Sequence, residues 1–522
     1  MNEREQGMTA DRQAREGGAV AGAAACNLQG SVELIFERSV PGLHGYRFAA
    51  LDIPEVAAEE VLPAALRREA PPLLPEVSEP EVARHYTALS TLNHHVEKSL
   101  YPLGSCTMKY NPKVNEELAR DPRLAGLHPD APESALQGIL GLLWEFQRAL
   151  ATIVGMDAVS LHPAAGAQGE FLGMKLFRAY HRSRGNDKRT ILIPDSAHGT
   201  NPASVVLSGF TPREVRSGPD GRIDPAALAS AIDERTAGIM ITNPNTLGLF
   251  EKNIEEIAAR IHAVDGLVYM DGANLNALMG LALPGAMGVD AVHMNLHKTF
   301  STPHGGGGPG AGPVGVKAAL EPFLPVPVVT RDERGFHLDC ERPRSIGRLH
   351  PYAGNIGVIL RAHAYIRSLG PDGLAEVSRA ALINANYLMR KVDSAFPVAK
   401  RETCMHEFVS SASWTREFGV RNVDVAKRLL DYGFHAPTVS FPLIVPDALM
   451  IEPTETETRG SLDRFAAALQ AIAAEVRENP ERVRSAPGCT RVGRLDEAEA
   501  ARRLRVRWRP AGTGDADDRE RG

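Results

Sequence analysis

Apolar and polar positions alternate along the middle of this chain with spacings that predict a series of helices and strands. A first helix is predicted from about Pro132, because large apolar residues recur at helical spacing until Gly155 ends the pattern. Short apolar runs, each typical of a buried strand, then alternate with helical segments. The predicted strands are 158–161, 190–193, 238–242, 266–270 and 291–296, with helices at 168–181, 225–233 and 254–264. This alternation predicts a parallel sheet with right-handed crossovers.

The pattern changes near residue 357, where strands no longer alternate regularly with helices. This change predicts a large α/β domain at 130–356, followed by a smaller α+β domain at 357–489. The elements predicted in the second domain are helices at 358–369, 374–392 and 461–478, and strand-like segments around 406–410 and 439–445.

The ends of the chain lack the large apolar residues that a packed core needs. Residues 1–30 and 490–522 are therefore predicted to be disordered tails, although Val506 and Trp508 could dock locally. Prolines are dense between 60 and 125, and residues 31–129 are predicted to form an extended arm that wraps around its neighbours.

Composition narrows the class of protein. The chain has 522 residues, of which 43% are hydrophobic and 23% charged, as in soluble proteins of several domains. Its net charge of −6 gives no reason to expect binding to nucleic acid or to an anionic membrane. No apolar stretch reaches the roughly 18 residues that can span a bilayer. The five scattered cysteines include no Cys-x-x-Cys pair, which indicates a reducing compartment, and we expect a cytoplasmic protein.

One lysine and one aspartate follow predicted strands where a parallel sheet gathers its functional loops. Lys298 comes after the run 291–296 and before a glycine-rich loop, and Asp271 ends the preceding strand. Burial of an ammonium in such a cleft favours the neutral, nucleophilic amine. Pyridoxal phosphate (PLP) requires this pair, because a lysine forms its Schiff base and a carboxylate keeps its pyridine nitrogen protonated. Lys298 alone would be read as a solvated loop lysine, but the pair predicts a PLP site.

The loop after the strand 158–161 is suited to a phosphate group. Gly166, Ala167 and Gln168 open the helix that follows, where small residues let backbone N–H groups approach an anion closely. Taken alone this feature is weak, because many turns that precede a helix contain glycine. Beside Lys298 it predicts where the cofactor phosphate binds.

Two further loops at strand ends supply polar or small residues. His198 could be an ordinary hydrogen-bonded loop histidine, or it could stack on a planar cofactor and take part in proton transfer. Thr246 lies in a turn rich in side-chain donors, and Ala273 is small enough for a ring to lie against it. We expect all three residues at the cofactor site.

A metal site is the rival interpretation of the histidines near Lys298. His293, His297 and His304 are close in sequence. On a strand, however, residues four apart lie about 13 Å apart, too far to share one ion. We therefore expect no metal ligands here.

Several segments resemble the P-protein of the glycine cleavage system, the family of glycine dehydrogenase (decarboxylating). They are His293–Phe300 with the glycines that follow it, Gly104–Asn111, Gly166–Glu170, Ser196–Asn201, His435–Thr438 and Glu452–Glu457. The resemblance extends from about residue 60 to 485. A single-chain member is about twice as long, and its first half lacks the lysine. This chain resembles the lysine-bearing half, which is subunit 2 of the split form.

The resemblance implies the aspartate-aminotransferase fold (fold type I), with PLP bound to Lys298 as a Schiff base. It also implies that Asp271 pairs with the pyridine nitrogen and that His198 stacks on the ring. The implied reaction is decarboxylation of glycine, with release of CO2 and transfer of the aminomethyl group to the lipoyl arm of the H-protein. The implied partner is a separate subunit 1, in a heterodimer or a heterotetramer with two copies of each.

Other roles follow from side-chain chemistry or from position in the chain. Lys109, His435 and Arg348 are candidates for orienting the glycine carboxylate. The glycine-rich loop near 304–310 could admit the lipoyl arm. We expect the Pro-rich arm at 60–125, which contains Gly104–Asn111, to cross the subunit interface and reach the neighbouring site.

Two other functions stay open. One is a different fold-type-I PLP enzyme, such as an amino-acid decarboxylase or a carbon–sulfur lyase, which would share the lysine and the aspartate. The other is a non-catalytic scaffold subunit, against which the presence of Lys298, Asp271 and His198 together argues. A purified PLP enzyme is yellow, whereas a scaffold subunit is colourless.

Overall fold

The computed structural model describes residues 32–46, 49–68, 70, 72–305, 310–504, 506 and 508. The predicted N-terminal tail at 1–30 lies outside the described residues, as do 306–309 of the glycine-rich loop. The described residues between 95 and 484 form one compact unit, and the remaining described residues form a second unit.

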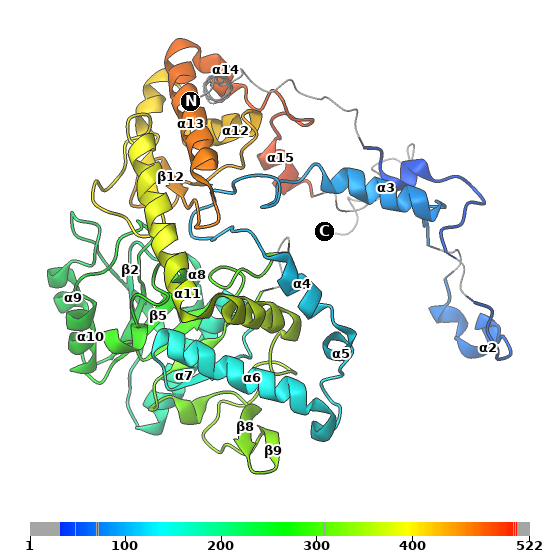
Figure 1. Cartoon of the computed structure of the whole chain (residues 1–522), viewed down its shortest axis with the longest axis horizontal. Helices are drawn as coiled ribbons and strands as arrows, with labels where there is room; N and C mark the ends of the chain where they lie inside the picture. The colour runs from blue at the N-terminus through cyan, green and yellow to red at the C-terminus, as the bar shows by residue number, and fades with distance from the viewer. Residues whose placement is uncertain are drawn as a thin grey trace, which may run out of the picture. The chain divides into compact units, whose positions relative to one another are not determined.

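A seven-stranded sheet organises the first unit (Figure 1). Its strands are β1 (Ala158–Ser160), β2 (Thr190–Pro194), β3 (Thr211–Val215), β4 (Thr236–Thr242), β5 (Leu267–Gly272), β6 (Ala291–Met294) and β7 (Val314–Val316). Their order across the sheet is β1-β7-β6-β5-β4-β2-β3, and β7 is antiparallel to both of its neighbours. The strands from β3 to β6 are parallel, as the sequence predicts. The sequence did not predict β3, a largely polar edge strand, or β7, a very short strand.

Helices cover both faces of this sheet. They are α6 (Glu133–Val154), α7 (Gly166–Ser183), α8 (Thr200–Leu207), α9 (Pro225–Ala231), α10 (Ile254–His262) and α11 (Ile356–Val392). Alternate residues of β2 show the two layers: Ile191 and Ile193 belong to the core beneath α7 and α8, whereas Leu192 belongs to the core beneath α6, α9, α10 and α11. Because both faces are covered, the central strands are continuously apolar rather than alternating.

A smaller antiparallel sheet carries the C-terminal part of this unit. Its strands are β10 (Phe408–Ser411), β12 (Ala448–Ile451) and β11 (Thr438–Val439), packed with α12 (Asn422–Asp431), α13 (Arg459–Glu478) and α14 (Pro480–Arg484). The predicted break between two helices is confirmed at Gly370, whose non-helical backbone interrupts α11. The strand predicted at 439–445 is wrong beyond Val439, because Pro442 and Pro446 remove backbone donors and the pairing strand is β12. The sequence did not predict α12.

Residues 95–129, predicted as part of the arm, pack within the first unit. Leu103 forms a bridge with Ile451 of β12, and α4 (Lys113–Ala119) is joined to α11 by an ion pair of 2.7 Å between Glu116 and Arg361. A short helix, α5 (Pro122–Ala125), and a hairpin of β8 (Val328–Asp332) and β9 (Gly335–Asp339) complete the regular structure near α6. The sequence did not predict the hairpin. The predicted arm therefore has a packed C-terminal end.

The second unit has little regular structure. Its elements are η1 (Ile35–Arg38), α2 (Ala58–Val61), η2 (Ala64–Leu66), α3 (Glu79–Ser90) and α15 (Glu497–Arg502). The indole of Trp508 stacks on Phe36 with ring centroids 4.4 Å apart, a local docking of the kind considered for this residue. The helix α15 lies where the sequence predicted a disordered tail, because good helix formers follow the N-cap Asp496. Among the described residues, no helix is long and apolar enough to cross a bilayer.

Candidate active site

A cavity of about 270 Å³ lies at the carboxyl ends of β5 and β6. Seven of the eight residues predicted from the sequence line it: Gly166, Ala167, His198, Thr246, Asp271, Ala273 and Lys298. They come from the segments that follow five strands, β1, β2, β4, β5 and β6, which meet because parallel strands present their carboxyl ends at one edge of the sheet. Their binding and catalytic roles stay predictions at this point.

Gln168 is the predicted site residue that does not line the cavity. Its side-chain oxygen accepts a hydrogen bond of 2.5 Å from the backbone N–H of Ala164. The side chain therefore stabilises the loop that leads into α7, and it contributes to the site through that loop.

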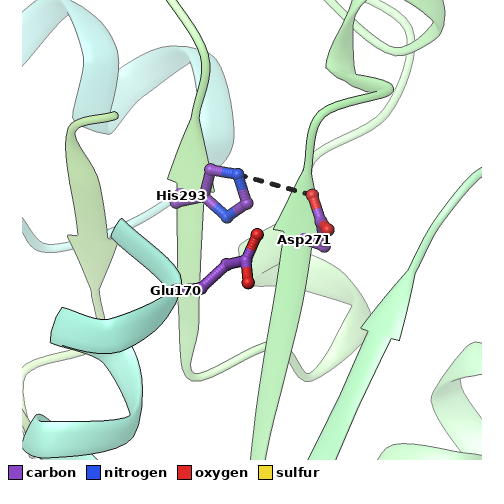
Figure 2. A group of neighbouring side chains, drawn as sticks. All are labelled: Glu170, Asp271 and His293. Atoms are coloured by element: carbon purple, nitrogen blue, oxygen red, sulfur yellow. Dashed lines mark ion pairs between the residues drawn. The ribbon is translucent and has the colours of Figure 1, made fainter. Parts of the chain in front are cut away.

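Asp271 is held at the end of β5 by two hydrogen-bond donors and a neighbouring histidine. It accepts hydrogen bonds from the Ala273 N–H at 2.9 Å and the Asn201 side-chain amide at 3.1 Å. Its third neighbour is His293 of β6, whose Nε2 lies 3.4 Å from a carboxylate oxygen; Figure 2 shows this pair with Glu170 beneath it. The other nitrogen of His293 lies 2.8 Å from the hydroxyl of Tyr269. Neither His293 nor Asn201 was predicted in this role, because their proximity depends on the strand pairing.

The surroundings favour the ionised form of Asp271. Burial by itself raises the pKa of this carboxyl. The charges of His293 and Lys298 and the N–H of Ala273 outweigh burial, so the pKa falls below its ordinary value. A buried carboxylate that stays anionic can hold a proton on a neighbouring ring nitrogen.

Glu170 links the first turns of α7 and α8. It is buried and accepts hydrogen bonds from the hydroxyls of Thr200 at 2.8 Å and Ser204 at 2.9 Å. The Thr200 hydroxyl also lies 2.9 Å from Nδ1 of His198, and the His198 ring meets Phe441 edge-on. These contacts fix the loop that carries His198 at the cavity wall. Possible metal-ligand atoms of Glu170, Asp271 and His293 lie within 4.8 Å of one another, but protein donors bond to both carboxylates.

The first turn of α7 offers backbone donors. Its N-cap, Ala165, makes no side-chain capping bond, so no side chain of the cap takes up the amides of this turn. A Cβ atom at Gly166 would lie only 2.4 Å from a side-chain oxygen of Asn295, so any larger residue here would displace the Asn295 side chain. The arrangement suits an anionic group.

Lys298 projects toward a turn that lies far away in the sequence. Its Nζ donates a hydrogen bond of 2.7 Å to the backbone carbonyl of Ser105. Burial, together with the charge of Lys298, lowers the pKa of His297 to about 3 and that of His304 to about 4. Both imidazoles are therefore neutral at physiological pH.

The three residues considered for the glycine carboxylate do not line this cavity. Lys109 is buried in an ion pair of 2.8 Å with Glu455. His435 stacks on Tyr101, and Arg348 lines a separate, mostly apolar cavity of about 470 Å³. The structure does not bring these three side chains to Lys298.

The segment 104–111 belongs to the arm that is predicted to cross a subunit interface. Within the chain itself, Gly104, Ser105 and Cys106 line the cavity, and the crossing of the interface stays a prediction. Glutamates of the C-terminal part of the unit hold this segment there. No local pattern in the sequence could reveal such pairing between distant segments.

The functional groups that line the cavity match the groups that PLP binding requires. It offers an amine for the aldehyde, a carboxylate for the pyridine nitrogen and helix-end amides for the phosphate. Buried polar atoms of Thr242, Asn295 and His297 have no hydrogen-bond partner among the described residues and line the same cavity. Such atoms indicate a polar ligand, because buried polar groups are normally bonded.

Comparisons with known proteins place the chain among relatives of one kind. Residues 50–417 match the family described as "Glycine cleavage system P-protein", and residues 377–486 match "Glycine dehydrogenase, C-terminal domain". A "Probable glycine dehydrogenase (decarboxylating) subunit 2" of Listeria monocytogenes is 54% identical over 483 residues, which is 92% of this chain and 99% of that relative.

Solved structures show the same fold. A crystal structure of a glycine decarboxylase (P-protein) of the glycine cleavage system in inhibitor-bound form matches with a TM-score of 0.66 and 22% identity, over 80% of this chain and 95% of that one. An aspartate aminotransferase of Thermus thermophilus matches with a TM-score of 0.54 and 17% identity, over 72% and 99%. The predicted aspartate-aminotransferase fold (fold type I), a large domain with a mainly parallel sheet followed by a smaller α+β part, is confirmed.

Proposed function

Because the chain belongs to the glycine cleavage system P-protein family, we propose that it catalyses the PLP-dependent decarboxylation of glycine. In this reaction CO2 is released and the aminomethyl group passes to the lipoyl arm of the H-protein. The observation that carries the proposal is the presence of Lys298 and Asp271 in one cavity of a fold-type-I chain.

Each predicted residue that lines the cavity has a proposed part. Lys298 holds PLP covalently, and the anionic Asp271 keeps the pyridine nitrogen protonated. His198 stacks on the ring and Ala273 lies against it, while Gly166 and Ala167 offer amides to the phosphate. Thr246 donates its hydroxyl proton to the carbonyl of Ser196, which leaves its oxygen free to accept a hydrogen bond from the ligand. PLP bound there would accept the electron pair that the departing carboxylate leaves on glycine.

The proposed partners follow from the names of the relatives. Those relatives are called subunit 2, so we propose that this chain assembles with a subunit 1, as a heterodimer or a heterotetramer with two copies of each. The lipoylated H-protein is the proposed acceptor, and the cytoplasm is the proposed compartment. A different fold-type-I decarboxylase or lyase is less favoured, because the family match spans residues 50–417.

Exchange of the glycine carboxyl with labelled bicarbonate tests the function. The full chain is purified alone and with subunit 1, and exchange is measured with and without lipoylated H-protein. We expect full exchange with both partners present and little from the chain alone, which should bind PLP weakly or aggregate. Full activity of the chain free of any copurified partner would refute the two-subunit proposal. A colourless complex without exchange would refute the enzymatic one.

A further inference from the structure

Two buried glutamates hold the turn that faces Lys298. Glu407 immediately precedes β10 and Glu452 immediately follows β12, and the antiparallel pairing of Phe408 with Ile451 brings the two carboxylates together. Both side chains are completely buried. Neither had a role in the sequence-based prediction of the site.

Each glutamate accepts two hydrogen bonds from one residue of the turn. Glu407 accepts the Ser105 N–H at 2.6 Å and the Ser105 hydroxyl at 3.0 Å. Glu452 accepts the Thr107 N–H at 2.9 Å and the Thr107 hydroxyl at 2.6 Å. Both oxygens of each carboxyl group accept a bond, so each of the two residues is held at its backbone and at its side chain.

These hydrogen bonds stabilise a turn whose backbone is strained. Ser105 and Thr107 have φ angles of 57° and 44°, in the left-handed region that ordinary L-residues rarely adopt. For the β-branched Thr107 this conformation is especially unfavourable. Strain of this kind persists only where surrounding contacts over-determine the conformation. The four bonds from Glu407 and Glu452 supply those contacts.

The held turn presents a backbone acceptor to Lys298. The carbonyl oxygen of Ser105 receives the hydrogen bond from Lys298 Nζ at 2.7 Å. Glu407 also accepts a bond of 3.1 Å from Asn274, which follows Asp271 by three residues. The turn is thereby fixed to the loop that begins at Asp271, the residue predicted to pair with the pyridine nitrogen.

Charge supports the same arrangement. Burial, and the proximity of the second carboxyl, raise the pKa of Glu407 to about 8; burial raises the pKa of Glu452 to about 7. The charge of Lys298 opposes both shifts. His406, whose pKa burial lowers to about 3, faces Glu452 as a neutral ring 3.9 Å away. Lys298 is therefore the cation that stabilises the ionised form of this pair.

We propose that Glu407 and Glu452 are positioning residues that hold the Ser105–Thr107 turn, so that the Ser105 carbonyl fixes the Lys298 amine in the cavity. The proposal rests on the proposed function in one respect, that Lys298 is the residue that holds PLP. Without the turn, the four-carbon stem of Lys298 would sample other rotamers, and its amine would be less often within reach of a bound aldehyde.

Hydrogen–deuterium exchange of the full chain without PLP tests directly whether Glu407 and Glu452 hold the Ser105–Thr107 turn, an arrangement that we call the clamp. The Ser105 amide in Glu407→Gln and the Thr107 amide in Glu452→Gln should each exchange at least about tenfold faster than in the wild type, since glutamine offers one accepting oxygen where the glutamate accepts through two. Glu251→Gln is the matched control. Glu251 is another buried glutamate that accepts two backbone N–H groups, but its donors are Ile223 and Asn253. It should leave exchange in the turn unchanged.

A second readout follows the amine itself. PLP is added to the PLP-free chain, and its attachment to Lys298 is timed by borohydride reduction and mass spectrometry. Attachment should slow about tenfold in both glutamate variants, because the amine is no longer oriented. Thr107→Val, which removes the hydroxyl at nearly constant shape, should slow attachment in the same direction. Thr107→Ser, which keeps both donors to Glu452, should restore the wild-type rate.

The outcomes separate this inference from the proposed function. Unchanged exchange of the turn amides in both glutamate variants would overturn the clamp. Faster exchange with unchanged or faster PLP attachment would overturn the positioning of Lys298 by the turn. If borohydride traps PLP on another residue of the wild type, the assignment of Lys298 fails, and the exchange experiment still decides whether the clamp exists.

Discussion

Nε2 of His293 lies 3.4 Å from Oδ1 of Asp271, and the register of β5 and β6 places these two residues side by side. The hydroxyl of Tyr269 forms a hydrogen bond with the other imidazole nitrogen, so the His293 ring is fixed from both sides. Asp271, which we propose faces the pyridine nitrogen, is thus in contact with a buried row of polar groups formed by His293 and Tyr269. This arrangement explains how a carboxylate at the bottom of the cavity can stay anionic.

Asp271→Asn should retain PLP and decarboxylate glycine roughly 100-fold more slowly. The loss is of the size found when one preorganised electrostatic group is removed, because a neutral pyridine accepts electrons poorly. Turnover and bound PLP are measured on the same preparation, with Asp220→Asn, a change at an exposed aspartate that does not line the cavity, as the control. Near-wild-type turnover would show that the carboxylate has a different role.

Lys298→Ala should lose covalently held PLP. The side chain donates to the Ser105 carbonyl and is the lysine that lines the cavity. Borohydride treatment followed by mass spectrometry should trap cofactor on the wild type and leave the variant unlabelled. The opposite result, with visible absorbance retained and cofactor trapped on the variant chain, would identify a different lysine.

Lys109→Ala should destabilise the protein by about 3–5 kcal/mol, because it leaves the buried Glu455 without its cation. The Lys109 ammonium also donates to Asn276 and to the carbonyl of Thr299. Burial by itself lowers the pKa of Lys109, but Glu455 outweighs burial and the pKa rises above its ordinary value. Denaturant unfolding measures the loss.

The double variant Lys109→Met with Glu455→Gln is the matched control for that prediction. It removes both charges at similar volume and should recover part of the stability. If Lys109→Ala costs less than about 1 kcal/mol, a typical value for an exposed pair, the ion pair is not part of the buried framework.

The Glu407–Glu452 pair predicts that stability falls as pH rises. In the unfolded chain these carboxyls ionise near their ordinary value of 4.5, whereas burial raises their folded pKa values to about 8 and about 7. Between about pH 5 and 8 the folded protein therefore holds protons that the unfolded chain has released, and this contribution is lost as pH rises. Thermal unfolding should give a lower melting temperature at pH 8.5 than at pH 6.

Glu407→Gln isolates this contribution, because it removes one titrating group of the pair. The difference between the melting temperatures at the two pH values should be smaller in the variant than in the wild type. An equal difference in both proteins would show that the pair does not titrate in this range.

Deletion of residues 1–28 together with 495–522 should leave PLP binding nearly unchanged, because the cavity is built from residues between 104 and 441. The deletion removes α15 and the stack of Trp508 on Phe36, a contact worth about 1 kcal/mol that belongs to the second unit. Trp508→Ala is the matched point change. A large fall in melting temperature in the double truncation would show that the tails stabilise the rest of the chain.

The sequence by itself determined the elements whose signals are local. Apolar runs such as that of β4 and the helical period of α6 are set by neighbouring residues, and both elements lie where they were predicted. Lys298 and Asp271 could be picked out for the same reason, since each follows a continuous apolar strand. Short or polar strands such as β3 and β7 carry too few residues for a periodic signal.

Only the tertiary structure decided which distant residues meet. His293 faces Asp271 because β5 and β6 are neighbours in register, and the Ser105 carbonyl reaches Lys298 across 193 positions of the chain. Glu407 and Glu452 become partners through the antiparallel pairing of β10 and β12. Such contacts are set by how whole elements pack, and packing is a property of surfaces assembled from several segments, so no single stretch of sequence records it.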